Sequence, residues 1–189
     1  AMARNALDAL VGQPGAAQSL VPAPLASLRP IALPAALTLT IFGATGLDAL
    51  VVAALALVIV LDQFPRNMFR GDPRAFATDA LALRLADAAI AAGHDMATPE
   101  PARQFFYLPF EHSESLADQD RAIALFAERM PGENLLHAQM HRDTIARFGR
   151  FPWRNAALGR PSTPEEQALL DAGGYGALVS GKVSLADAG

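Results

Sequence analysis

The chain has 189 residues, with 15 basic and 19 acidic side chains and no cysteine. This length suits one domain over residues 1–189. The lack of cysteine excludes disulfide bonds and thiolate sites. It is also compatible with a cytoplasmic location. The formal net charge of −4 gives no driving force for binding nucleic acid or an anionic bilayer, and an apolar content of 52% excludes disorder for most of the chain.

The first third of the chain is almost free of charge. Asp48 is the only charged residue between positions 31 and 61, and the uncharged runs on either side of it have 18 and 13 residues. A membrane-spanning helix needs about 20 consecutive apolar residues, and the longer run is interrupted by proline and glycine. We therefore expect buried helices and no membrane contact. A membrane-associated protein with an apolar hairpin at 31–61 is the alternative.

The first well-marked helix follows this segment. Asp72 precedes Pro73 as an N-cap before a first-turn proline, and Gly93 follows as a stop, so we predict a helix over residues 73–92. Apolar side chains fall on two opposite faces of this helix. They are Phe76, Ala80, Leu83 and Ile90 on one face and Leu81, Leu85 and Ala88 on the other. A helix that is apolar on two sides is expected to lie between neighbours.

Start and stop signals predict further helices over about 98–109, 115–130, 133–148 and 162–173. Ser115 and Asp118 resemble a capping box with the shorter acid, and Pro131-Gly132 is a stop signal. No alternating strand pattern occurs past residue 62, and the connections are short. The sequence therefore predicts an all-α fold of antiparallel helical hairpins.

One short motif occurs twice. Phe64-Pro65-Arg66-Asn67 has a counterpart in Phe151-Pro152-Trp153-Arg154-Asn155, and the two motifs start 87 residues apart. Because proline disfavours a helix interior, we expect both motifs at helix boundaries. The spacing is compatible with stacked helical pairs.

Several strings that include these motifs resemble the bacterial DUF924 family over about residues 55–172. The strings are Leu61–Gly71 (LDQFPRNMFRG), Pro73–Asp79 (PRAFATD), Tyr107–Glu114 (YLPFEHSE), His141–Asp143 (HRD), Phe148–Pro152 (FGRFP), Arg154-Asn155 and Leu158–Arg160 (LGR). The resemblance implies a soluble, tetratricopeptide-like array of helices whose biochemical role is unassigned. Residues 1–46 are atypical, because they lack the family's Asp-Phe-Trp-Phe segment. Trp153 stands where members often have histidine, and residues 177–189 are expected to form a loose tail.

The densest polar group lies just after Pro109. Glu111 and His112 are adjacent there, and a carboxylate beside an imidazole is a serviceable acid/base pair near neutral pH. We therefore name Glu111 and His112 as candidate catalytic residues. The alternative interpretation is that they cap the next helix.

His137 and His141 are four residues apart and share one helix face. With Glu111 as a third ligand they could hold a metal ion, but the glutamate that follows the first histidine in zinc proteases is replaced by Ala138. Histidines that are hydrogen-bonded inside a helical array are commoner. We assign no metal site and expect no cofactor.

Arginines gather near the two Phe-Pro motifs, and planar guanidinium groups bind carboxylates and phosphates with paired hydrogen bonds. If the motifs meet in space, they form a cationic groove for a small anionic ligand or a protein partner. The candidate ligand-binding residues are Arg66, Asn67, Arg70, His141, Arg147, Arg150, Arg154 and Asn155. The alternative is that the arginines pair internally with nearby acids, namely Asp62, Asp72, Asp79, Glu111 and Asp143.

The leading functional prediction is a soluble helical-repeat protein that binds a partner or a small anionic ligand in this groove, with homo-oligomerisation left open. The competing prediction is a small hydrolase or lyase in which Glu111 and His112 perform acid/base chemistry while arginines hold an anionic substrate. Both predictions require the two Phe-Pro motifs to lie side by side.

Overall fold

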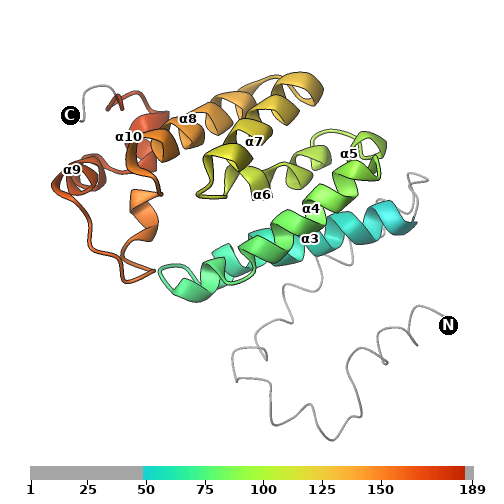
Figure 1. Cartoon of the computed structure of the whole chain (residues 1–189), viewed down its shortest axis with the longest axis horizontal. Coiled ribbons are helices and arrows are strands. Elements are labelled where there is room, and N and C mark those ends of the chain that lie inside the picture. The colour runs from blue at the N-terminus through green and yellow to red at the C-terminus, as the bar shows by residue number, and fades with distance from the viewer. Residues whose placement is uncertain (1–48, 186–189) are drawn as a thin grey trace, which may run out of the picture. The chain divides into compact units, whose positions relative to one another are not determined.

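The computed structural model describes residues 49–185, which belong to one compact unit, Thr45–Gly189. The described residues form helices and contain no strand, so the all-helical prediction is confirmed for them (Figure 1). The α-helices are α3 (Ala49–Met68), α4 (Asp79–Ala91), α5 (His94–Ala97), α6 (Leu108–Glu111), α7 (Leu116–Arg129), α8 (Glu133–Phe148), α9 (Pro164–Ala172) and α10 (Tyr175–Val179). Three 3₁₀ helices are η3 (Pro73–Phe76), η4 (Ala102–Phe106) and η5 (Pro152–Arg154). The atypical segment 1–46 lies outside the described residues.

Helices α3 and α4 pack side by side (Figure 1). A stripe of buried positions at helical spacing on α3, which includes Val51, Leu55 and Val58, faces α4, where small side chains such as Ala82 and Ala86 allow close approach. The stripe continues into Asp62, which is also buried. The carboxylate of Asp62, near the end of α3, therefore lies in the interior.

Among the described helices, α3 alone is long and apolar enough to cross a membrane, with a mean hydropathy of 1.9 over its best window. A core helix of a soluble protein meets the same criterion. The apolar hairpin considered at 31–61 lies in part outside the described residues.

Helices α7 and α8 form the second close pair. Helix α7 buries Ala122, Leu125 and Phe126 and ends just before Pro131. Helix α8 spans the predicted residues and ends at Phe148, and the following Gly149 has a φ of 68° that suits glycine. Ser115 precedes α7 but makes no side-chain cap bond, so the capping-box interpretation is wrong. Ser113 Oγ instead donates to Asp118 Oδ2 over 2.6 Å.

Short helix α6 contacts α3, α4, α7 and α8, and it therefore links the two pairs. The helix predicted over 98–109 is wrong, because the chain forms η4 and then α6 in this stretch. Prolines at positions 99, 101 and 109 remove backbone donors and prevent one continuous helix. The aromatic side chains of Phe106, Tyr107 and Phe110 are buried here, which fixes the segment that leads to His112.

The helix predicted over 73–92 is divided into η3 and α4, and neither of its two predicted apolar faces is buried throughout. Leu81 and Ala88 of the second face are exposed, and so is Ala80 of the first. The buried stripe of α4 consists of Ala82, Ala86, Ala89 and Ile90. Pro65 also departs from expectation, since it lies in the last turn of α3 rather than at its boundary, whereas Pro152 opens η5.

The C-terminal part begins with η5 and α9. Thr163 and Glu166 form a reciprocal capping box at the start of α9. The loose tail expected from Ala177 is corrected in part, because Ala177 and Leu178 are buried within α10.

Candidate functional site

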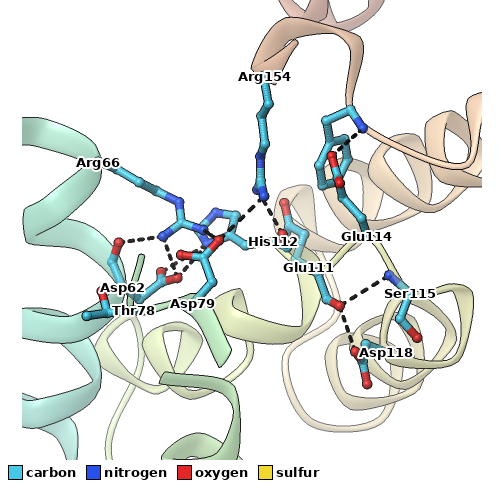
Figure 2. Close-up of polar contacts among 12 residues, drawn as sticks. Asp62, Arg66, Thr78, Asp79, Glu111, His112, Glu114, Ser115, Asp118 and Arg154 are labelled. Atoms are coloured by element: carbon cyan, nitrogen blue, oxygen red, sulfur yellow. Dashed lines mark hydrogen bonds and ion pairs between the residues drawn. The ribbon is translucent and has the colours of Figure 1, made fainter. Parts of the chain in front are cut away.

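Five charged or titratable side chains from four parts of the chain meet in one place, which we call the central polar cluster. They are Asp62 and Arg66 from α3, Asp79 from α4, His112 just after α6, and Arg154 from η5. Figure 2 shows Arg66 and Arg154 converging on the carboxylate of Asp79. The hydroxyl of Thr78 donates to the carbonyl of Leu61 over 2.6 Å and ties the end of α3 to the start of α4.

Asp62 anchors one side of the cluster and is only 1% exposed. Its carboxylate lies 2.9 Å from Arg66 Nη1 and 2.9 Å from His112 Nδ1. Burial acts to raise the pKa of Asp62, but the charges and hydrogen bonds of His112 and Arg66 outweigh it and hold the pKa below its ordinary value. Asp62 is therefore an ionised group that orients both partners.

Asp79 joins the two arginines. Its Oδ2 accepts from Arg66 Nη2 over 2.8 Å and from Arg154 Nη1 over 3.4 Å. Burial raises the pKa of Asp79 despite the two guanidinium groups. Its Oδ1 is buried and has no hydrogen-bond partner in the described part of the chain.

Arg154 is a buried cation with few acceptors. Its side chain is 9% exposed, and its guanidinium lies over the rings of Phe76 and Phe151, with distances of 4.6 and 4.7 Å to the ring centroids. Besides the long contact with Asp79, it donates to the carbonyl of His112 over 2.8 Å. A guanidinium carries five N–H donors, so three donors have no acceptor among residues 49–185. Burial and the nearby Arg66 charge lower the pKa of Arg154 to about 10, and the group remains charged at neutral pH.

A recess of about 310 Å³ opens beside this guanidinium. Its lining contains both polar and apolar residues. The polar residues are Asp79, His112, Ser113, Glu114 and Arg154, and the apolar residues are Phe76, Ala80, Leu83, Pro109 and Leu158. Binding sites for small molecules have this composition, an apolar wall with a few convergent polar groups.

A second carboxylate–imidazole pair lies next to the cluster. Glu111 is 3% exposed, and its Oε1 lies 2.5 Å from His141 Nδ1, while its buried Oε2 has no hydrogen-bond partner in the described residues. The His141 ring stacks on Tyr175 with a centroid distance of 4.6 Å. Burial lowers the pKa of His141 although Glu111 opposes this shift.

Glu111 and His112 were expected to work as a pair, but each has another direct partner. His112 contacts Asp62, Glu111 contacts His141, and the centroids of the two imidazole rings are 6.5 Å apart. The site thus contains two neighbouring imidazoles, each oriented by its own buried carboxylate. Their assignment as catalytic residues stays a prediction.

The structure brings together part of the predicted ligand-binding set. Arg66 and Arg154 share Asp79, so residues from the two Phe-Pro motifs meet as required. His141 lies beside the cluster through its contact with Glu111.

The remaining predicted residues make other contacts. Arg70 donates to Asn67 in an exposed contact of 3.2 Å, Arg147 lies 3.7 Å from Glu165, Arg150 binds Glu166, and buried Asn155 contacts Glu166 and Arg160. These groups support helix ends rather than line the recess.

Sequence reasoning placed Asp62 and Asp79 only among the acids available for internal pairing. The spacing of Asp62 and Arg66, four residues apart on one helix, was a usable signal for the first contact. The contact of Arg154 with Asp79 joins residues 75 apart, and no local pattern indicates it.

The two histidines weighed as metal ligands, His137 and His141, have different partners. His137 Nδ1 lies 2.6 Å from the hydroxyl of Tyr175. Within residues 49–185, no group of three or more histidine and acidic side chains is placed to hold a metal ion.

The chain belongs to the DUF924 family, described as bacterial proteins of unknown function, whose family model matches residues 43–174. This confirms the resemblance. A solved structure of a protein of unknown function from Agrobacterium tumefaciens is similar, with 52% identity, a TM-score of 0.63, and coverage of 65% of this chain and 69% of that chain. No curated protein matches this chain significantly.

Proposed function

We propose that the central polar cluster and its recess bind a small anionic ligand. The observation that carries this proposal is Arg154, a buried guanidinium with three unused N–H donors beside a cavity. A buried charge is costly unless it is paired and hydrogen-bonded. An anion in the recess would supply the missing acceptors.

The neighbouring groups fit this role. Arg66 has closer acceptors than Arg154, with contacts of 2.9 Å to the Asp62 carboxylate and 2.8 Å to Asp79, so it fixes the position of Asp79. Asp79 contacts Arg154 only at 3.4 Å. Arg154 is therefore held in place mainly by its bond to the His112 carbonyl and by the rings of Phe76 and Phe151. Such a cation is pre-oriented for a ligand.

The experiment that tests this proposal is an NMR titration of the whole ¹⁵N-labelled chain with sodium acetate and, separately, with sodium phosphate. We expect saturable shifts at the amides of Ser113 and Glu114 for at least one of these anions. Arg154→Met should weaken the binding at least about tenfold, because two charge-assisted hydrogen bonds are lost.

Arg70→Met is the matched control, since Arg70 is exposed and lies outside the recess. It should bind as the unmodified chain does. Equal binding by Arg154→Met and Arg70→Met, or no saturable shift with either anion, would contradict the proposal.

A second candidate function is acid/base catalysis on an anionic substrate, as in a hydrolase or lyase. The observation in its favour is the contact between buried Asp62 and His112 Nδ1. If this nitrogen carries the proton, Nε2 is the basic nitrogen, and it has no hydrogen-bond partner among the described residues. A carboxylate that orients an imidazole in this way supports general-base catalysis.

This candidate is tested with a panel of small nitrophenyl esters. His112→Gln should lower any hydrolysis by about 100-fold or more, because general acid/base groups contribute about 10²–10⁴. Asp62→Asn should lower it as well, since it changes the tautomer that is favoured. Unchanged hydrolysis in His112→Gln would exclude this role.

We also propose a tetratricopeptide-like arrangement for the helices. The support is the close packing of α3 on α4 and of α7 on α8, with α6 in contact with both pairs. In such an array the recess lies where separate helical pairs meet.

A further inference from the structure

We infer that the ligand of the recess is a monocarboxylate with an apolar body, of the size of a short aliphatic or aromatic acid. This inference rests on the proposed function and specifies its ligand class. It follows from three properties of the recess, namely its charge balance, the shape of its cationic group and its mixed polar and apolar lining.

The charge balance favours a single negative charge. Three guanidinium groups in or next to the recess already pair with three carboxylates: Arg66, Arg154 and Arg160 with Asp62, Asp79 and Glu114. Of these six groups, Arg154, Asp79 and Glu114 line the recess itself. Arg160 holds Glu114 through two bonds of 2.7 and 3.0 Å. Although burial acts to raise its pKa, Arg160 and the Phe151 amide keep the pKa of Glu114 below its ordinary value. The ionised carboxylate of Glu114 in the wall repels a phosphate dianion more strongly than a monocarboxylate.

The cationic group also favours a carboxylate. A guanidinium presents parallel N–H donors that match the two oxygens of a carboxylate. Arg154 offers unused donors, and its plane is held by the rings of Phe76 and Phe151. One such fork satisfies one carboxylate head.

The rest of the wall requires an apolar body. Leu83, Pro109 and Leu158 line the recess and come from α4, α6 and the chain after η5. The Phe76 ring, on which Arg154 packs, lines it as well. A volume of about 310 Å³ is at the lower limit of common small-molecule sites. Acetate would leave these apolar side chains exposed to water, whereas the alkyl chain of hexanoate would cover them.

The test compares sodium hexanoate, sodium acetate, sodium phosphate and the zwitterion norleucine by NMR titration of the whole chain. We expect hexanoate to bind about tenfold or more tightly than acetate, because each buried methylene contributes to affinity. Norleucine and phosphate should bind more weakly than hexanoate. Tighter binding of phosphate or norleucine would overturn the inference.

A matched pair of variants locates the apolar contact. Leu83 is half-buried and lines the recess, whereas Leu81 is exposed and is not among the residues that line it. Leu83→Ser should reduce the advantage of hexanoate over acetate to about threefold, and Leu81→Ser should leave it unchanged. If Leu83→Ser does not fold by circular dichroism, Leu83→Ala provides the same comparison.

The outcomes separate the two proposals. If none of the four probes binds, the proposed function fails. If acetate or phosphate binds through Arg154 as tightly as hexanoate, the recess still binds anions and only the ligand class is wrong. If the advantage of hexanoate is unchanged in both Leu83 variants, the apolar wall is not the contact and the inference fails.

Discussion

Two arginines four residues apart, Arg150 and Arg154, illustrate how differently one residue type is used in this protein. Arg150 donates to both carboxylate oxygens of Glu166, over 2.6 and 2.8 Å, and to the carbonyl of Pro161 over 2.9 Å. Arg154 is more deeply buried, yet it has one short bond and one long contact. Arg150 and Glu166 therefore form a fully hydrogen-bonded ion pair, which we call the structural joint, whereas Arg154 keeps donors for a ligand.

The surroundings of the two arginines explain the difference. Glu166 also accepts from the amide of Thr163 in the capping box, so the pair with Arg150 fixes the start of α9. Asp79 is already bound to Arg66 and can give Arg154 only a distant oxygen. Arg154 shares Asp79 with Arg66 and therefore has fewer close acceptors than Arg150. Arg154 is also the arginine that borders the recess.

The largest expected effect is on the structural joint. Arg150→Met should lower the Tm by about 5 °C, because Glu166 is 2% exposed and would lose its cationic partner. Differential scanning calorimetry of the whole chain measures this change. A decrease in Tm of less than about 1 °C would contradict the structural role given to Arg150.

Acid should also weaken the ion pair between Arg150 and Glu166. The hydrogen bond from Arg150 lowers the pKa of Glu166 to about 2, below its ordinary value of 4.5, although burial opposes this shift. A lowered folded-state pKa contributes stability that is present above the unfolded value and is lost as the pH falls through the folded value. The urea concentration at the midpoint of unfolding should therefore decrease as the pH is lowered from about 5 to about 2. Glu166→Gln should make this decrease smaller. If the midpoint decreases as steeply in Glu166→Gln, the loss of stability in acid is due to other acids such as Asp62, whose pKa is also lowered.

Replacement of the second arginine should cost less stability. Arg154→Met removes a buried cation whose pairing is incomplete, and an apolar side chain of similar length can pack against Phe76 and Phe151. We expect the Tm to change by less than about 2 °C in calorimetry. A larger loss than that of Arg150→Met would show that Arg154 is mainly structural.

The smallest effect is expected at an exposed pair. Asp72 contacts Arg74 over 2.9 Å, and both side chains are at least one-third exposed. Arg74→Met should leave the Tm and the affinity for anions unchanged within error, since exposed ion pairs contribute little. A clear loss of anion affinity in this variant would mean that the general positive charge of the region, rather than Arg154, determines binding.

Much of the fold was predictable from local signals. Helix α8 has the predicted bounds, because the Pro131-Gly132 stop precedes it and Gly149 follows it. The second face of α4 was not predictable, since alanine and leucine occur on both sides and only tertiary packing decides which side is covered.

The site was predictable only in part. The groove hypothesis required arginines of the two Phe-Pro motifs to meet, and Arg66 and Arg154 do so at Asp79. It did not indicate which arginines find complete acceptors nearby. That distinction depends on distant partners, such as Glu166 for Arg150 and Asp79 for Arg154.

The most direct test of the account is the Nε–H signals of Arg150 and Arg154 in ¹⁵N NMR spectra during a titration with hexanoate. Arg150 Nε already donates to Glu166 over 2.6 Å, whereas Arg154 Nε donates to no described acceptor. We predict that the Arg154 signal shifts and exchanges more slowly with water as hexanoate is added, while the Arg150 signal stays in place. An unchanged Arg154 signal, or equal shifts of both signals, would contradict the account.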